Sequence, residues 1–182
     1  IWNVFFDRPA ARPYRSYTSE RKDTMAQVVS KGRRALVIVR PYLIGPFKGA
    51  LQLTFYEGAR LIHVEASVST QEEKCAILYD AGLVGESSGW RQFAWMDTEG
   101  QLRRSPFDAQ ITDRRIAVRH RAIIAECERG SVACFPPPHQ YQFPRDWTDN
   151  LKFTWLGKGH HDSPRFGFGI RQEPDGKRPF EP

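Results

Sequence analysis

The densest group of side chains that could bind a ligand follows three consecutive prolines, Pro136 to Pro138. Within eleven residues after them lie an imidazole, two carboxylates, a guanidinium group and two large aromatic rings: His139, Tyr141, Arg145, Asp146, Trp147 and Asp149. Consecutive prolines hold the backbone extended and donate no hydrogen bonds. The sequence therefore predicts a polar and aromatic loop mounted on a rigid lead-in, an arrangement suited to function.

This composition favours a carbohydrate ligand. Aromatic rings can cover the apolar side of a sugar ring, while charged groups bind its hydroxyl groups or a carboxylate. We expect Tyr141, Arg145, Trp147 and Asp149 to contact the ligand. The alternative is structural: Arg145 pairs with Asp146, Trp147 fills one end of the domain, and His139 is an ordinary surface histidine.

A second group combines two histidines and an aspartate, His160, His161 and Asp162. Neighbouring side chains of an extended chain point in opposite directions, so one metal ion cannot easily bind both imidazoles. We therefore expect no metal site and no cofactor. If the protein is an enzyme, which the sequence leaves open, the candidate acids and bases are His139, Asp146 and these three residues. Arg165 and Arg171 complete the expected ligand contacts.

A third pair, His63 and Glu65, lies two residues apart, on one face of a predicted strand. The two side chains could orient each other or a ligand. A solvated polar face is the favoured explanation, because the alternation of apolar residues with them along the strand alone accounts for them. The chain contains no serine elbow, phosphate-binding loop, paired CxxC or HExxH motif, so common hydrolase, nucleotide-binding and zinc-protease sites lack support.

The formal net charge of +6 comes mainly from dispersed arginines. Pairs such as Arg103-Arg104 and Arg114-Arg115, with Arg119 and Arg121 nearby, could attract phosphates or acidic sugars, or could simply form a solvated sheet face. No zinc finger, recognition-helix pattern or single-strand platform motif accompanies them. There is also no apolar run of eighteen residues. We expect neither a nucleic-acid nor a membrane partner.

Residues 51–69 are the stretch that most clearly predicts an element. Apolar and polar residues alternate in two runs separated by Glu57-Gly58-Ala59-Arg60, the pattern of a β-hairpin with one buried and one wet face. Strands joined so tightly must be antiparallel. The buried face is expected to hold Ile62, Val64, Ala66 and Val68.

Further apolar runs bounded by glycine and proline predict strands at residues 2–6, 34–41, 90–96, 101–104, 131–135, 151–155 and 165–171. Residues 115–126 can be read as a helix or a strand, and their β-branched content and the following Gly130 favour a strand. Glycines in the last strand indicate close backbone approach. The result is an all-β chain, an antiparallel β-sandwich forming a single domain over residues 1–182. We expect it to be a segment of a longer polypeptide, whose remainder is its partner.

Two of the three cysteines, Cys127 and Cys134, flank a predicted turn at Gly130-Ser131. Such a turn would place them opposite each other on paired strands, so a disulfide is geometrically conceivable. Two free thiols acting as small apolar residues are the alternative.

The hairpin sequence LQLTFYEGARLIHVEASVST at residues 51–70, with antiparallel strands before and after it, resembles the β-supersandwich of galactose-mutarotase-like domains. The resemblance concerns strand style over residues 34–170. It implies a carbohydrate connection: a sugar-binding or accessory domain, or alternatively a catalytic mutarotase, polysaccharide lyase or glycosidase domain. Mutarotases use a histidine and a glutamate as acid and base, but His63 and Glu65 do not match them by context. A domain that only packs against its neighbours is a third possibility.

Overall fold

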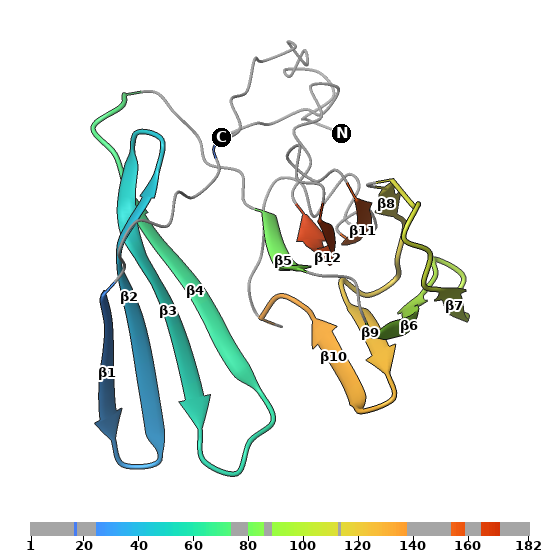
Figure 1. The fold of residues 1–182 in the computed structure, drawn as a ribbon, viewed down its shortest axis with the longest axis horizontal. Helices are drawn as coiled ribbons and strands as arrows, with labels where there is room; N and C mark the ends of the chain where they lie inside the picture. The colour runs from blue at the N-terminus through green and yellow to red at the C-terminus, as the bar shows by residue number, and fades with distance from the viewer. Residues whose placement is uncertain are drawn as a thin grey trace, which may run out of the picture. The chain divides into compact units, whose positions relative to one another are not determined.

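The computed structural model describes Tyr17 and residues 25–73, 80–85, 89–112, 114–137, 154–158 and 165–171. These residues form twelve strands and no helix (Figure 1). Every paired strand is antiparallel to its neighbour, in three sheets of four strands. The expectation of an all-β, antiparallel sandwich is confirmed. Among the described residues no helix is long and apolar enough to cross a membrane.

The chain divides into two compact units, residues 15–75 and residues 1–14 with 76–182. We call residues 15–75 the meander unit and residues 1–14 with 76–182 the sandwich unit. The expectation of a single domain stays a prediction.

The meander unit is one sheet whose strands follow each other in chain order: β1 (Met25–Lys31), β2 (Arg34–Ile44), β3 (Phe47–Tyr56) and β4 (Ile62–Ser69). Two-residue turns connect β1 to β2 and β2 to β3, and a five-residue loop, residues 57–61, connects β3 to β4. The turn between β2 and β3 contains Gly45 at φ +56° followed by Pro46, because a left-handed residue there closes the hairpin. The predicted hairpin of residues 51–69 is confirmed, with Leu53 paired to Val64.

The expected burial of this hairpin is wrong. Alternation does place Ile62, Val64, Ala66 and Val68 on one face, yet all eight residues of β4 are exposed. Alternation defines which residues share a face, but burial also requires a second layer against that face.

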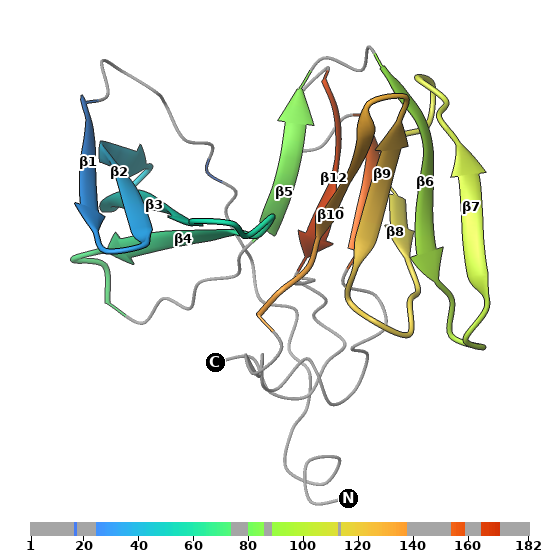
Figure 2. The ribbon, with the colours of Figure 1, turned by 90° about the horizontal axis from the view of Figure 1, so that it is seen from below.

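The sandwich unit contains the other two sheets. One has the order β10-β9-β6-β7, from β6 (Trp90–Met96), β7 (Leu102–Pro106), β9 (Ile123–Cys127) and β10 (Gly130–Cys134). The other has the order β5-β12-β11-β8, from β5 (Asp80–Gly85), β8 (Arg114–Ile116), β11 (Thr154–Lys158) and β12 (Phe166–Arg171). Figure 2 shows these two sheets stacked face to face. Residues 115–126 therefore supply strands rather than a helix.

The core of the sandwich unit lies between its two sheets. It consists of Phe93, Ile116, Val118, Ile123, Ala125, Leu156, Phe166 and Phe168. Phe93 is at its centre: its ring stacks on Phe166 and lies against Phe168, with centroids 5.4 Å away in each case. The close approach expected of the last strand is also present, since an added Cβ at Gly169 would lie 2.0 Å from the carbonyl oxygen of Ala81.

The hairpin of β9 and β10 differs from its prediction. Cys127 pairs with Gly130 and Cys134 with Ile123, so the turn residues are Glu128 and Arg129, two positions earlier than expected. Both cysteines are free thiols, which rules out the disulfide arrangement in this structure. Cys134 packs against the core, and burial raises the pKa of its thiol to about 11.

Candidate ligand-binding site

Most of the side chains that the sequence predicts to act lie outside the described residues: His139, Tyr141, Arg145, Asp146, Trp147, Asp149, His160, His161 and Asp162. Their predicted roles stay predictions. Arg165 immediately precedes β12, and Arg171 is its last residue. Their Cα atoms are separated by the length of that strand, about 20 Å at 3.3 Å per residue. Their predicted ligand contacts stay predictions.

His63 and Glu65 lie on the polar face of β4, opposite Thr54 and Gln52 of β3. Both are exposed. The carboxylate of Glu65 accepts a hydrogen bond from the Ser67 hydroxyl at 3.3 Å, and Ser67 in turn accepts one from the Gln52 amide at 3.1 Å. Glu65 is thus engaged along its own strand and with β3, in a solvent-facing polar row.

The structure reveals a hollow of about 410 Å³ at one end of the sandwich unit. It is lined by Arg119, His120, Arg121, Ala122, Phe135, Pro136 and Pro137. We call it the 119–137 hollow. Its two walls come from the segment that enters β9 and the segment that leaves β10.

Strand register explains why these segments meet. Ile123, the first residue of β9, is paired with Cys134, the last residue of β10. The chain before Ile123 and the chain after Cys134 must therefore leave the sheet side by side. Proline then prevents the second segment from continuing the ladder, because it has no backbone N–H. The hollow opens where pairing stops.

Buried residues anchor both walls. Val118 and Ile123 are fully buried on either side of the first segment, and Pro136 is buried in the second. The backbone N–H of Arg119 also donates to the carbonyl of Met96 at 2.9 Å, which ties this wall to the end of β6. A short hydrogen bond of 2.7 Å from the Ala122 N–H to the His120 carbonyl turns the chain toward β9.

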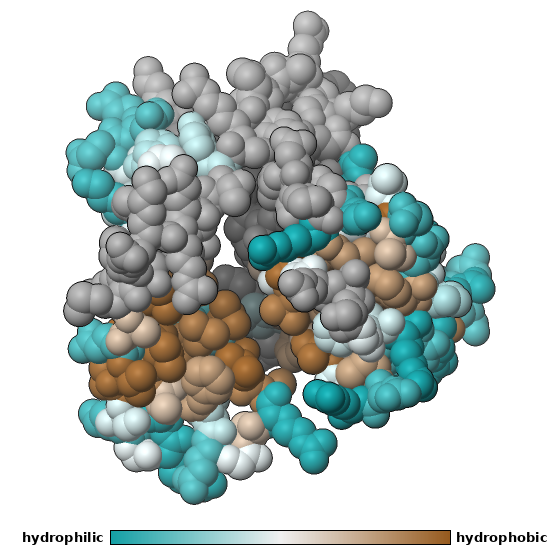
Figure 3. All heavy atoms as spheres, in the orientation of Figure 1, coloured by the Kyte–Doolittle hydropathy of each residue, from teal (hydrophilic) through white to brown (hydrophobic). Residues whose placement is uncertain are grey.

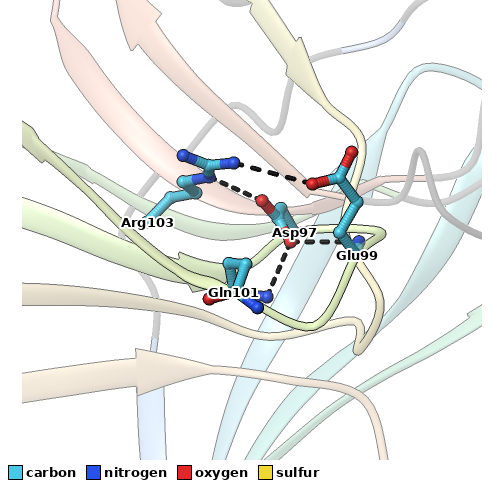
Figure 4. A network of polar contacts seen from close by, with 4 residues as sticks. All are labelled: Asp97, Glu99, Gln101 and Arg103. Carbon is cyan, nitrogen blue, oxygen red and sulfur yellow. Dashed lines mark hydrogen bonds and ion pairs between the residues drawn. The ribbon is translucent and has the colours of Figure 1, made fainter.

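The turn between β6 and β7 supports the Arg119 side of the hollow. An added Cβ at Gly100 would lie 2.6 Å from Nη1 of Arg119, so the guanidinium group extends over this turn. The turn itself is fixed by Asp97, whose carboxylate accepts hydrogen bonds from the backbone N–H groups of Glu99 and Gln101 and from Nε of Arg103 (Figure 4). The Gln101 hydrogen bond is the main cause that lowers the Asp97 pKa, and Arg103 adds to it.

The chemistry of the hollow is basic and aromatic. Arg119 and His120 are exposed, and the Phe135 side chain is 48% exposed. No Asp or Glu is among the described lining residues, whereas two arginines and one histidine are. Such a surface favours an anion that also has an apolar side to place against a ring.

The sequence pattern does not single out these residues as a site. Arg119 and Arg121 belong to a dispersed basic set, and Phe135 is the end of a predicted strand. One signal in the sequence could have indicated this hollow. A predicted strand ends at Phe135-Pro136-Pro137, and its hairpin partner begins two residues after Arg121. Using it requires the correct register of the β9–β10 hairpin.

Within the described ranges, no group of three His, Cys, Asp or Glu side chains is placed to hold a metal ion. Comparisons with protein-family models, with curated proteins and with solved structures found no match to this chain.

Proposed function

We propose that the chain is a carbohydrate-associated β-sandwich that binds an acidic saccharide in the 119–137 hollow. The observation that supports this is that the hollow is lined by the exposed Phe135 together with Arg119, His120 and Arg121, with no Asp or Glu among the described lining residues. A uronic acid offers both features that such a surface binds: an apolar ring face and a carboxylate. The hollow also falls within the usual size range of small-ligand sites, which is about 300–1,000 Å³.

The two kinds of group have separate roles in this proposal. Arginine binds a carboxylate through paired, charge-assisted hydrogen bonds, which supplies selectivity for an acidic sugar over a neutral one. The aromatic ring supplies contact area for the sugar face and excludes water from it. The proline-rich lead-in places the sequence segment 139–149, itself predicted to bind sugar, directly after this wall in the chain.

Isothermal titration calorimetry with an oligogalacturonate tests the proposal, with a neutral galacto-oligosaccharide and inorganic phosphate as comparison ligands. We expect binding of the acidic sugar only, and a loss of about tenfold or more in affinity for Phe135→Ala and for Arg119→Gln. Arg104→Gln is the matched control, because it removes the same charge from an exposed position on β7 outside the hollow.

Three results would contradict the proposal. They are absence of oligogalacturonate binding, equal affinity for phosphate, and equal weakening by Arg119→Gln and Arg104→Gln. The last result would show attraction to overall positive charge rather than a site.

A further inference from the structure

The meander unit has one face composed almost entirely of apolar side chains. Strand pairing aligns three complete rows across it: Ala26–Val39–Leu51–Ala66, Val28–Val37–Leu53–Val64 and Ser30–Ala35–Phe55–Ile62. Residues directly opposite in antiparallel strands share a face, so these twelve form one surface, which we call the apolar face. Its single polar member is Ser30, and it carries no charge.

Much of this face is exposed to solvent, and five residues of its central strands are half-buried: Ala35, Val37, Val39, Leu51 and Leu53. The exposed fractions are 65% for Val28, 58% for Val64, 55% for Ile62 and 38% for Phe55, and none of the twelve residues is buried. Among the residues of this sheet whose burial is described, Ala50 and Thr54 are buried, and both lie on its other face. In Figure 3 apolar residues are grouped over this sheet, and hydrophilic residues lie toward the end where β1 turns into β2 and β3 turns into β4. Apolar surfaces of this extent usually mark an interaction site.

We propose that the apolar face binds the same face of a second copy of this chain, forming a two-fold symmetric dimer. The distribution of side-chain sizes supports a second copy. In the row Ser30–Ala35–Phe55–Ile62, the small residues belong to β1 and β2 and the large ones to β3 and β4.

A two-fold axis parallel to the strands reverses strand order between copies while keeping each row opposite itself. Ala35 then faces Phe55 of the second copy, and Ser30 faces its Ile62. In this row large residues meet small ones on both sides of the axis, as close packing between layers requires. In the middle row Val28 meets Val64, so apolar residues of similar size meet there. The strands of the two sheets run nearly in line, which is a common geometry of stacked sheets.

Charge and area are consistent with this occupant. An uncharged face needs an uncharged partner, and a second copy supplies one. Four strands about 4.8 Å apart and about seven residues long give a footprint of roughly 450 Å² on each copy. The dimer would bury on the order of 1,000 Å² in total, the lower limit for a specific interface. We therefore expect a weak dimer, with a dissociation constant in about the micromolar range.

Sedimentation velocity of the 182-residue chain over a range of concentrations tests the proposal. The expected result is a reversible monomer–dimer equilibrium. Val64→Lys introduces a charge into the middle row and should weaken the dimer by about a hundredfold or more. His63→Lys is the matched control, because His63 is its neighbour on the opposite, polar face of β4 and its substitution should leave the equilibrium unchanged.

Disulfide exchange supplies a second measurement that does not depend on the lysine variant folding. Chains carrying Val28→Cys are mixed with chains carrying Val64→Cys in the presence of glutathione disulfide, which is reduced to glutathione as the protein thiols are oxidised, and linked peptides are identified by mass spectrometry. The two-fold arrangement predicts the Val28–Val64 link between copies, and no link when His63→Cys replaces the Val64 variant. The proposal is overturned by a monomer at every concentration, by equal effects of the two lysine variants, or by absence of the predicted link.

Discussion

The two units of this chain follow the same strand rules but bury their apolar residues differently. In the sandwich unit two sheets stack, and Phe93, Leu156 and Phe168 are at most 1% exposed. In the meander unit an equally regular alternation leaves Val28, Ile62 and Val64 more than half exposed. The difference shows that a strand pattern specifies a face, whereas stability comes from the second layer placed against that face.

A Phe→Ala substitution in each unit tests this comparison, and the largest difference in unfolding free energy is expected here. Phe93→Ala removes a ring surrounded by Phe166 and Phe168, and we expect a loss of about 3–5 kcal/mol in unfolding free energy. Phe55→Ala removes a ring that is 38% exposed, and should cost less than about 1 kcal/mol in the monomer.

Denaturant titration at low protein concentration distinguishes the two variants. All five tryptophans belong to the sandwich unit, so their fluorescence reports its unfolding, while circular dichroism reports both units. Phe93→Ala should shift the fluorescence transition and Phe55→Ala should not. If Phe55→Ala shifts it as far as Phe93→Ala does, the two units share one cooperative core and the comparison fails.

An intermediate effect is expected where strands of the sandwich unit approach each other most closely. The Cβ of Gly169→Ala would lie 2.0 Å from the Ala81 carbonyl oxygen and 2.6 Å from Cα of Gly82, so β5 and β12 would have to move apart. We expect a loss of about 1–3 kcal/mol, measured by thermal or denaturant unfolding. Gly85→Ala is the control on β5, because no atom lies within 4 Å of its added Cβ. Equal stability of the two variants would argue against this close packing.

The smallest expected effect is on the melting temperature, for variants in one turn of each unit. In the sandwich unit this effect should depend on pH. The pKa of Asp97 is lowered by the Gln101 backbone N–H and by Arg103. Because this pKa is lower in the folded chain than in the unfolded chain, the Asp97 carboxylate stabilises the fold at pH values above its unfolded-state pKa. That stabilisation is lost as the pH falls through the folded-state pKa. Asp97→Asn should therefore reduce the melting temperature at pH 7, with a difference from the original chain that shrinks below about pH 4.

Glu57→Gln provides the counterpart in the meander unit. Glu57 pairs with Arg33 at 3.3 Å, but both side chains are more than 70% exposed. Exposed ion pairs of this kind contribute little, so the melting temperature should be unchanged at pH 7. A pH-independent effect of Asp97→Asn, or a larger effect of Glu57→Gln, would contradict this assignment of the two turns.

Local chemistry in the sequence was sufficient to locate many strands and turns. The alternation around Leu53 and Val64, and the turn residues Asp97 to Gly100, predict two hairpins that the structure contains. Period-two patterns and turn residues act over a few positions, so they can be recognised without knowing the rest of the fold. The Pro136-Pro137 stop after β10 is of the same kind.

Tertiary structure decided what those elements meet. It placed the β9–β10 turn at Glu128 and Arg129, which separated Cys127 from Cys134 and brought Arg121 and Phe135 into the lining of one hollow. It also buried Phe93 while leaving Val64 exposed. Register and burial depend on which surfaces pack together, and these contacts join residues far apart in the chain. The sequence by itself located many of the strands and, where apolar and polar residues alternate, their faces. It did not locate β1 or β5, and only the assembled sheets decided which faces were covered and where a hollow opened.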